Sequence, residues 1–150
     1  MTYTPGSLRT MILTLLSRAK PRGKILGKGL PMIISNEKDI PTEHIAAHGG
    51  AGIMKIKFAF KDYQHSGNNN DSQWNCFAVA ELPVGVATGY HRHVDTDEFF
   101  YIIDGEATIT VDGEARQIKK GDIILTRKGS SHGITNVKRK LRFTVTEIFR

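Results

Sequence analysis

Short segments in which apolar and polar residues alternate follow one another along most of this chain. The clearest covers residues 52–61, where Met54, Ile56 and Phe58 are separated by lysines. Because neighbouring side chains of a strand point to opposite faces, this alternation predicts a half-buried strand. The same pattern, or a short apolar run, predicts strands at 74–82, 99–103, 107–111, 115–119, 123–126 and 141–149, with a first short strand and turn at 32–40.

Turn-forming residues separate the predicted strands, and a polar stretch at 62–73 predicts a long surface loop. The turn signals are Gly105, Asp112-Gly113, Lys120-Gly121-Asp122 and the charged run 137–140. Helical periodicity is nearly absent. Many short strands with regular turn signals therefore predict an all-β antiparallel sandwich or barrel. The 150 residues suffice for one sizeable core.

Two histidines and a glutamate lie close together at His91, His93 and Glu98. On an extended chain the two histidines project from the same side. Glu98 follows a short acidic turn and begins the next strand, so we predict a hairpin whose two arms share one metal ion. A lone histidine on a strand is more often an ordinary packed side chain. Several such groups buried together without a cation, however, would leave polar atoms unpaired.

A later stretch adds a third histidine, His132. The two stretches read G-x5-H-x-H-x4-E-x6-G over 85–105 and G-x5-R-x-G-x2-H-x3-N over 121–136. They resemble the paired signature motifs of the cupin superfamily, as found in its small single-domain members. The first motif matches in full, whereas in the second Arg127 stands where the family has a proline that makes the turn rigid. The resemblance covers about half the chain, from Trp74 to Phe149.

The resemblance implies a fold, a ligand set and an assembly. The fold is a double-stranded β-helix, a small jelly-roll barrel formed by residues 32–150. The implied metal ligands are His91, His93, Glu98 and His132, and four ligands on an octahedral ion leave two positions open, as catalytic sites require. Imidazole and carboxylate donors suit divalent Fe, Mn or Ni, with Zn as an alternative. Pairing of two such barrels into a homodimer is also implied.

Three classes of function remain open, because a fold does not fix a function. The first, which we prefer, is a dioxygenase or other oxidoreductase acting on a small molecule. The second is a non-redox isomerase, lyase or decarboxylase, in which the ion acts as a Lewis acid and Glu98 as the catalytic base. The third is a barrel that binds metal and ligand without turnover. A small, partly apolar substrate is favoured by the residues predicted to fill the barrel, namely Trp74, Phe77, Phe99, Phe100 and Ile102.

Two further histidines, His44 and His48, are spaced as on one face of a helix, but Gly49-Gly50 stops any helix at once. We interpret them as loop or first-strand residues, with the alternative that one of them lines the mouth of the site. Near the predicted ligands, three basic residues either attract an anionic substrate or are solvated loop charges, namely Arg92, Arg127 and Lys128.

The net charge of +6 belongs to the first part of the chain, because residues 1–31 hold six basic and no acidic residues. No aromatic-studded basic face accompanies them, so we predict no nucleic-acid partner. We interpret residues 1–31 as a basic arm, either flexible or in contact with a partner subunit as a short amphipathic helix. A transit-like sequence and an extension ahead of a true start at Met32 are the alternatives.

Composition also bears on location. No apolar run reaches the roughly 18 residues of a membrane span. The apolar segment 11–16 is followed by basic residues rather than by a small-residue cleavage site, which disfavours export. The single cysteine, Cys76, excludes an intrachain disulfide and lies in an apolar run that predicts a buried core position. We therefore predict a cytoplasmic protein without a membrane partner.

Overall fold

The computed structural model describes residues 32–64 and 72–150. The chain divides into two units, 1–33 and 34–150, and all described strands lie in the second. The predicted basic arm at 1–31 and most of the predicted surface loop lie outside the described residues. The elements in order are η1 (Glu37–Asp39), β1 (Glu43–Ile45), η2 (Ala47–Gly49), β2 (Met54–Phe58), η3 (Lys61–Tyr63), β3 (Trp74–Leu82), β4 (His91–Arg92), β5 (Thr96–Val111), β6 (Glu114–Lys119), β7 (Ile123–Thr126) and β8 (Ser131–Phe149).

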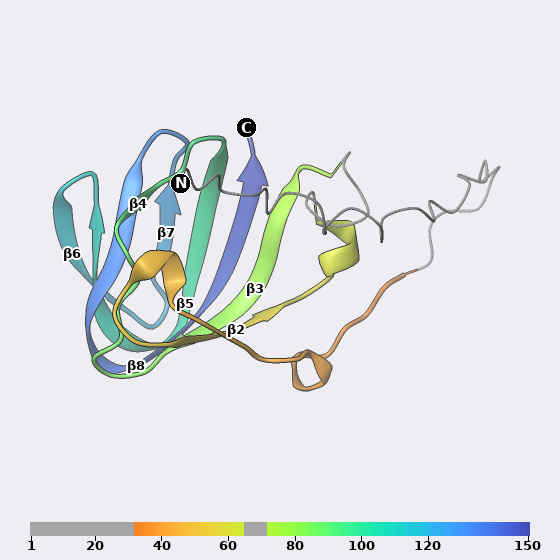
Figure 1. Cartoon of the computed structure of the whole chain (residues 1–150), viewed down its shortest axis with the longest axis horizontal. Coiled ribbons are helices and arrows are strands. Elements are labelled where there is room, and N and C mark those ends of the chain that lie inside the picture. The colour runs from red at the N-terminus through yellow and green to blue at the C-terminus, as the bar shows by residue number, and fades with distance from the viewer. Residues whose placement is uncertain (1–31, 65–71) are drawn as a thin grey trace, which may run out of the picture. The chain divides into compact units, whose positions relative to one another are not determined.

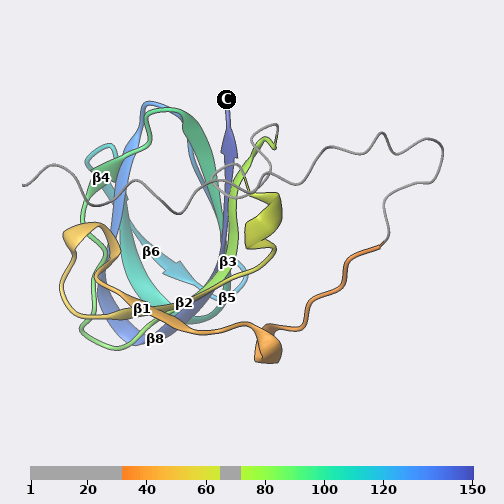
Figure 2. The same ribbon diagram turned by 45° about the vertical axis from the view of Figure 1, so that its right-hand side comes forward.

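One antiparallel sheet of eight strands makes up the second unit, in the order β1-β2-β3-β8-β5-β6, with β4 beside β8 and β7 beside β5. The long strands β5 and β8 pair with each other from Thr96↔Phe149 to Val111↔His132. They curve as they do so, and the sheet folds over on itself into a barrel (Figures 1 and 2). The all-β jelly-roll prediction is therefore confirmed. No helix among the described residues is long and apolar enough to cross a membrane.

The core lies between the curved faces of this sheet and follows the alternation that the sequence predicts. Met54 and Ile56 of β2 are buried, whereas Lys55 between them is exposed. On β5, Phe100 and Ile102 point inward with Glu98, and Tyr101 points outward with 46% of its surface exposed. Each fully buried aliphatic side chain such as Ile102 contributes about 1.5–3 kcal/mol to the free energy of unfolding.

The predicted hairpin between the two halves of the first motif is wrong. β4 pairs with β8, where His91 lies opposite His132, and not with the strand that carries Glu98. The backbone of His93 also pairs with the second motif. His93 N–H donates to Ser130 O at 2.9 Å, and Gly129 N–H donates to His93 O at 2.6 Å. The two motifs therefore meet directly, strand against strand.

Two predicted turns are bends within long strands. β5 continues through Gly105, and β8 continues through residues 137–140. Gly105 has a φ of 99°, and a Cβ there would lie 2.3 Å from Lys140 O, so only glycine allows the two strands to pass this closely. The pairing register shifts on either side of Gly105. Such irregularities increase the local bend of a sheet, and here they help it to curve into a barrel.

The predicted first strand at 32–40 is also wrong. Residues 37–39 form the short 3₁₀ helix η1, because the side chain of Asn36 caps it by accepting a hydrogen bond from Lys38 N–H at 3.1 Å. The first strand is β1, beginning at Glu43, and it pairs with β2.

Candidate metal centre

Three histidines converge inside one end of the barrel. His91 lies on β4, His132 lies opposite it on β8, and His93 follows His91 by two residues. One ring nitrogen from each of the three lies within 4.8 Å of the others, so the group could hold a metal ion. His93 and His132 are buried, with 5% and 2% of their surface exposed, and His91 is half-buried at the rim.

Each imidazole is fixed by a contact at its Nδ1 atom. His91 Nδ1 lies 3.0 Å from the carbonyl oxygen of Gly89, which can only accept, so this nitrogen carries the proton. His132 Nδ1 lies 3.1 Å from Thr126 Oγ1. His93 Nδ1 lies 3.1 Å from Thr96 Oγ1 and 3.2 Å from Glu147 Oε1. Contacts of this kind orient histidine ligands and direct the Nε2 atoms toward a metal ion.

Glu98 joins two of the three histidines from β5. Its Oε2 atom lies 2.9 Å from His132 Nε2 and 3.5 Å from His93 Nε2. The Nε2 atoms of His93 and His132 are themselves 3.1 Å apart. All four predicted site residues are therefore gathered in one place. Their role as ligands stays a prediction.

The donor set fits a cation. Among the described residues, two fully buried side-chain polar atoms make no hydrogen bond of acceptable geometry, His91 Nε2 and Glu98 Oε2, although the latter is in ion-pair contact with His132 Nε2. Leaving such atoms unpaired in the interior costs about 1–3 kcal/mol each, which is rare in folded proteins. A divalent ion among these nitrogen and oxygen donors would satisfy both atoms at once.

The pKa values of His91 and His93 are shifted in opposite directions. Burial lowers the pKa of His91 to about 4, so its ring is neutral at pH 7. Hydrogen bonds to Glu147 and Glu98 raise the pKa of His93 to about 9. Burial opposes ionisation of Glu98, but the neighbouring imidazoles of His132 and His93 outweigh it and lower the pKa of this carboxyl to about 2. Without a metal ion, therefore, a protonated imidazole lies among carboxylates.

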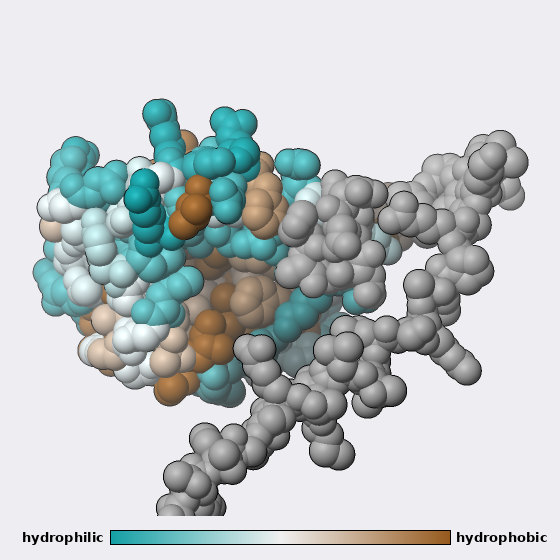
Figure 3. All heavy atoms as spheres, turned by 45° about the horizontal axis from the view of Figure 1, so that its top comes forward, coloured by the Kyte–Doolittle hydropathy of each residue, from teal (hydrophilic) through white to brown (hydrophobic). Residues whose placement is uncertain are grey.

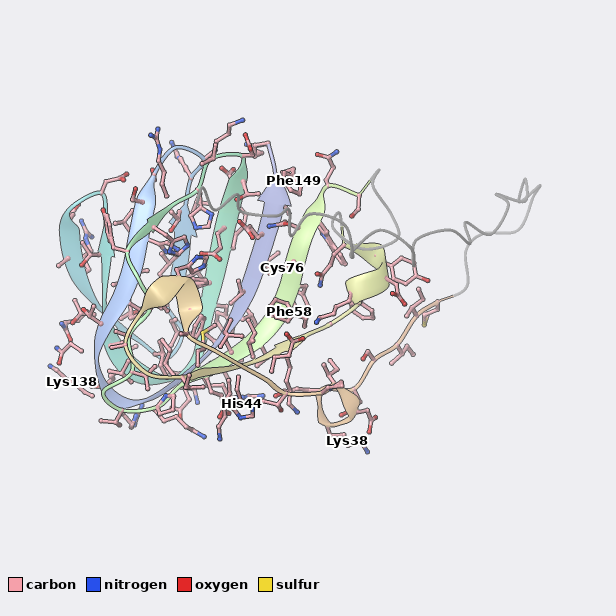
Figure 4. The ribbon with its side chains drawn as sticks, viewed as in Figure 1. Lys38, His44, Phe58, Cys76, Lys138 and Phe149 are labelled. Carbon is pink, nitrogen blue, oxygen red and sulfur yellow. The ribbon has the colours of Figure 1, made fainter. Side chains whose placement is uncertain are left out.

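A cavity of about 610 Å³ opens beside these residues. Apolar and polar residues of the described chain line it in equal number, and Figure 3 shows hydrophobic side chains gathered in the hollow with hydrophilic ones around it. Phe58 of β2 and Cys76 of β3, both labelled in Figure 4, belong to this wall. Cys76 is only partly buried rather than a closed core residue. The apolar lining residues are Ile45, Ala46, Ala47, Met54, Ile56, Phe58, Cys76, Phe100, Phe143 and Val145, and the polar ones include Lys61, Gln64, Asn75 and Glu147.

The structure corrects the predicted filling of the barrel. Phe100 lines the cavity, but Trp74 is 42% exposed at the start of β3. Phe77 and Phe99 follow the alternation of their strands to the other face, and neither belongs to the described cavity lining. Most of the apolar wall comes instead from residues 45–47, β2 and β8, and the motifs do not indicate the contribution of residues 45–47 and β2.

Of the two earlier histidines, His48 is the one that lines the site. It lines the cavity at its mouth, where its ring stacks on that of His91 with the ring centres 3.4 Å apart and the planes 9° apart. His44, by contrast, is exposed on β1. The three basic residues near the motifs are exposed, and none belongs to the described lining of the cavity. Arg92, for example, donates from Nε to Gly129 O at 3.0 Å.

The turn that precedes His132 is formed without the family's proline. Ser130 N–H donates to Arg127 O at 2.9 Å, and Lys128 N–H donates to Asp97 Oδ1 at 2.8 Å. The Asp97 carboxylate also pairs with Arg150 at 2.9 Å. These hydrogen bonds hold the backbone of the turn, so Arg127 does not displace the histidine.

Comparisons with known proteins agree with this fold. Residues 78–149 match the model of the cupin domain family. An oxalate-binding protein of Thermotoga maritima is 29% identical over 110 residues, which are 73% of this chain and 86% of that protein. An uncharacterized protein of Methanocaldococcus jannaschii is 38% identical over 60 residues, 40% of this chain and 48% of that protein.

Solved structures share the fold. A predicted oxalate decarboxylase from Thermotoga maritima has a TM-score of 0.70 at 28% identity, over 79% of this chain and 100% of that one. A polyketide cyclase from Streptomyces resistomycificus has a TM-score of 0.63 at 16% identity, over 79% of this chain and 80% of that one, and shows likeness of fold alone. The matched domain, the shared fold and the two motifs that meet at the histidines identify the chain as a member of the cupin superfamily.

Proposed function

We propose that this protein is a metal-dependent enzyme that acts on a small molecule bound in the cavity beside the three histidines. One observation carries the proposal. The buried atoms His91 Nε2 and Glu98 Oε2, which make no hydrogen bond of acceptable geometry with the described residues, belong to side chains that line a 610 Å³ cavity. A cation there would be accessible from the cavity, which distinguishes a reactive site from a closed structural one.

His91, His93, His132 and Glu98 would hold a divalent ion, with Fe, Mn or Ni preferred and Zn as an alternative. Bound there, the ion would supply a Lewis acid and, if redox-active, a site for chemistry with O2. The chain's own contribution is to fix the donors. The Gly89 carbonyl keeps the proton of His91 on Nδ1, and Glu147 accepts from Nδ1 of His93, which leaves both Nε2 atoms for the ion.

The cavity favours a substrate with an oxygen-rich head and an apolar body. The names of the oxalate-binding relative and of the predicted oxalate decarboxylase favour a carboxylate or a similar head group. A cavity of 610 Å³ is, however, within the range of about 300–1,000 Å³ typical of sites for much larger ligands. We infer that the head lies at the histidines and that the body packs against Met54, Phe100 and Phe143.

A dioxygenase reaction is our first choice of chemistry. A substrate whose apolar body packs against Met54, Phe100 and Phe143 would displace water from the cavity, which would protect reactive intermediates from hydrolysis. A non-redox decarboxylation is the second candidate, favoured by the decarboxylase-like relative. In that reaction CO2 leaves the substrate carboxylate, the carbon that remains takes up a proton from water, and the ionised Glu98 would accept that proton from water and relay it to the carbon. Binding without turnover is the third outcome that an assay must separate from these two.

The first experiment is elemental analysis of the protein expressed without a metal-chelating tag, alongside His91→Ala and His132→Ala. We expect near-stoichiometric metal in the wild type and its loss in both variants. The loaded protein is then given small carboxylates and enols with aromatic or aliphatic bodies while O2 uptake and CO2 release are recorded. O2 uptake supports the dioxygenase, and CO2 release without O2 uptake supports the decarboxylase. A folded wild type that binds no supplied metal would refute the proposal.

We also infer a homodimer and a cytoplasmic location. Three apolar side chains share the outer face of β5 and β7 and are 42–74% exposed, namely Tyr101, Ile123 and Leu125. An exposed apolar patch on a sheet favours a protein partner, and a second copy of this chain would cover both patches in one symmetric interface. Light scattering on the purified protein tests the dimer, and Ile123→Lys is expected to produce monomers.

A further inference from the structure

The ring of His48 stacks on one face of the ring of His91. The two rings are nearly parallel, with a centre-to-centre distance of 3.4 Å. His48 is exposed, and His91 is half-buried beneath it. The other two histidines of the triad are buried and have side-chain partners inside the barrel. At its own Nδ1, His91 has a backbone carbonyl as partner.

Close backbone contacts hold His48 in this position. His48 has a φ of 50° and a ψ of 36°, a left-handed conformation that non-glycine residues seldom adopt outside functional or tightly constrained sites. The segment 47–51, which contains the gold η2 turn in Figures 1 and 2, lies against the segment 87–89 that leads into His91. Gly89 N–H donates to Ala47 O, and Ala87 N–H donates to Ala51 O, both at 2.9 Å.

Two glycines make this contact possible. A Cβ on Gly89 would lie 1.9 Å from His48 O, and a Cβ on Gly50 would lie 2.1 Å from Ala87 O. We call the two segments, 47–51 and 87–89, the clamp. The clamp fixes the backbone of His48, and its Gly89 carbonyl accepts a hydrogen bond from Nδ1 of His91.

We propose that His48 is a positioning residue for His91. Its ring prevents the imidazole of His91 from rotating about its Cβ–Cγ bond, and so keeps Nε2 directed toward the Nε2 atoms of His93 and His132. This inference rests on the proposed function, because the benefit of a fixed Nε2 is tighter metal binding. His48 lies before both motifs, so a residue from the N-terminal half of the chain would help to orient a ligand of the metal centre.

The test compares two substitutions at one position. His48→Asn keeps a residue type that tolerates a left-handed backbone but removes the ring. His48→Phe keeps a flat ring without nitrogen atoms. His44→Ala, an exposed histidine on β1, is the matched control. Affinity for Co²⁺ is measured by calorimetry with a competing chelator, and thermal unfolding of each metal-free variant shows that it is folded.

We expect His48→Asn to weaken Co²⁺ binding by about 10–100-fold, the range found when groups that orient metal ligands are removed. His48→Phe and His44→Ala are expected to bind like the wild type. Unchanged affinity in His48→Asn would overturn the inference. An equal loss in His48→Asn and His48→Phe would also overturn it, because the effect would then come from the imidazole nitrogens and not from the stacked ring.

A second readout separates this inference from the proposed function. Nitrogen NMR of the metal-free protein reports which ring nitrogen of His91 carries the proton. We expect the Nδ1–H form in the wild type and in His48→Phe, and a mixture of both forms in His48→Asn. If the wild type bound no metal, the proposed function would fail, and this comparison alone would decide whether His48 orients His91. Identical His91 signals in all three proteins would refute the positioning role.

Discussion

Replacing Gly89 with alanine tests whether the clamp is a rigid part of the fold. Gly89 has no positive φ, so the backbone there accepts alanine without conformational strain. The added methyl group, however, would lie 1.9 Å from His48 O and 2.8 Å from His48 C. Side-chain carbons do not approach other atoms closer than about 3 Å, so the two segments must separate by about 1 Å.

The expected loss of stability follows from what this separation disrupts. The two hydrogen bonds across the clamp, Gly89 to Ala47 and Ala87 to Ala51, each contribute about 0.5–1.5 kcal/mol. Inserting a methyl group into packed structure typically costs another 1–3 kcal/mol. We therefore expect a loss of about 3 kcal/mol in the free energy of unfolding. For a domain of this size, each kcal/mol lowers Tm by about 4 °C, which gives a decrease of about 12 °C.

Urea and thermal unfolding of the metal-free protein measure this loss, with Gly113→Ala as the control. Gly113 has a φ of 85° and open space around its Cα, so alanine there reports backbone strain alone, about 1–2 kcal/mol. The reasoning is refuted if Gly89→Ala loses less than Gly113→Ala. That result would mean that the segment 47–51 moves aside freely and cannot hold His48 in place.

Three further predictions concern single residues. Ile102→Ala, at a site with no exposed surface, should lower the free energy of unfolding by about 2–5 kcal/mol in urea titrations, and a loss below 1 kcal/mol would show that the barrel collapses around the gap. Glu147→Gln should weaken metal binding by about tenfold in chelator competition, because the contact at 3.2 Å from His93 Nδ1 loses its charge, and unchanged affinity would exclude this orienting role. Burial raises the pKa of the Cys76 thiol to about 12, whereas a thiol in an unfolded chain has a pKa near 8.5. Between these two pH values the thiol is protonated in the folded protein and ionised in the unfolded chain. Alkylation of Cys76 should therefore stay slow up to about pH 10 in the native protein and become fast on unfolding, and rapid native alkylation at pH 8 would contradict this environment.

The strands that the sequence predicts correctly are those in which alternation and turn chemistry agree. Residues 74–82 coincide with β3, and the Asp112-Gly113 turn joins β5 to β6 as expected. Prediction fails at Gly105 and at residues 137–140, where turn-forming residues lie inside β5 and β8. Glycine and charged residues allow a strand to bend as well as to end. Which of the two occurs depends on the pairing of β5 with β8, a contact between distant segments that no local pattern contains.

The same limit applies to the site. Motif spacing gathers His91, His93, Glu98 and His132, because each lies at a fixed offset from a glycine in one of two short stretches. The position of His48 depends instead on β1 and β2 pairing at the edge of the sheet and on the contact between 47–51 and 87–89. The one local signal is a histidine followed by two glycines, which predicts a left-handed turn and says nothing of what the turn contacts. The part of the cavity wall that β2 and β8 form could not be predicted for the same reason, because it depends on pairing between distant segments.

The electrostatic arrangement gives a separate argument for a cation at this centre. Glu98 and Glu147 lie directly opposite each other on β5 and β8, and like charges in such a cross-strand pair destabilise a sheet. Burial opposes ionisation of both carboxyls, but their pKa values are nevertheless lowered, because His132 and His93 contact Glu98 and His93 contacts Glu147. His93 keeps its proton, and its own pKa is raised to about 9. In the metal-free protein the proton of His93 supplies the positive charge that the two carboxylates require. A divalent ion bound to His93 Nε2 would supply that charge in its place, while the Nδ1 proton remained on the side of Glu147. The fold therefore favours a positive charge at this point. A divalent ion would satisfy the neutral His91 Nε2 as well as Glu98 Oε2, whereas a proton on His93, whose Nε2 lies 3.5 Å from Glu98 Oε2, leaves His91 Nε2 without a partner.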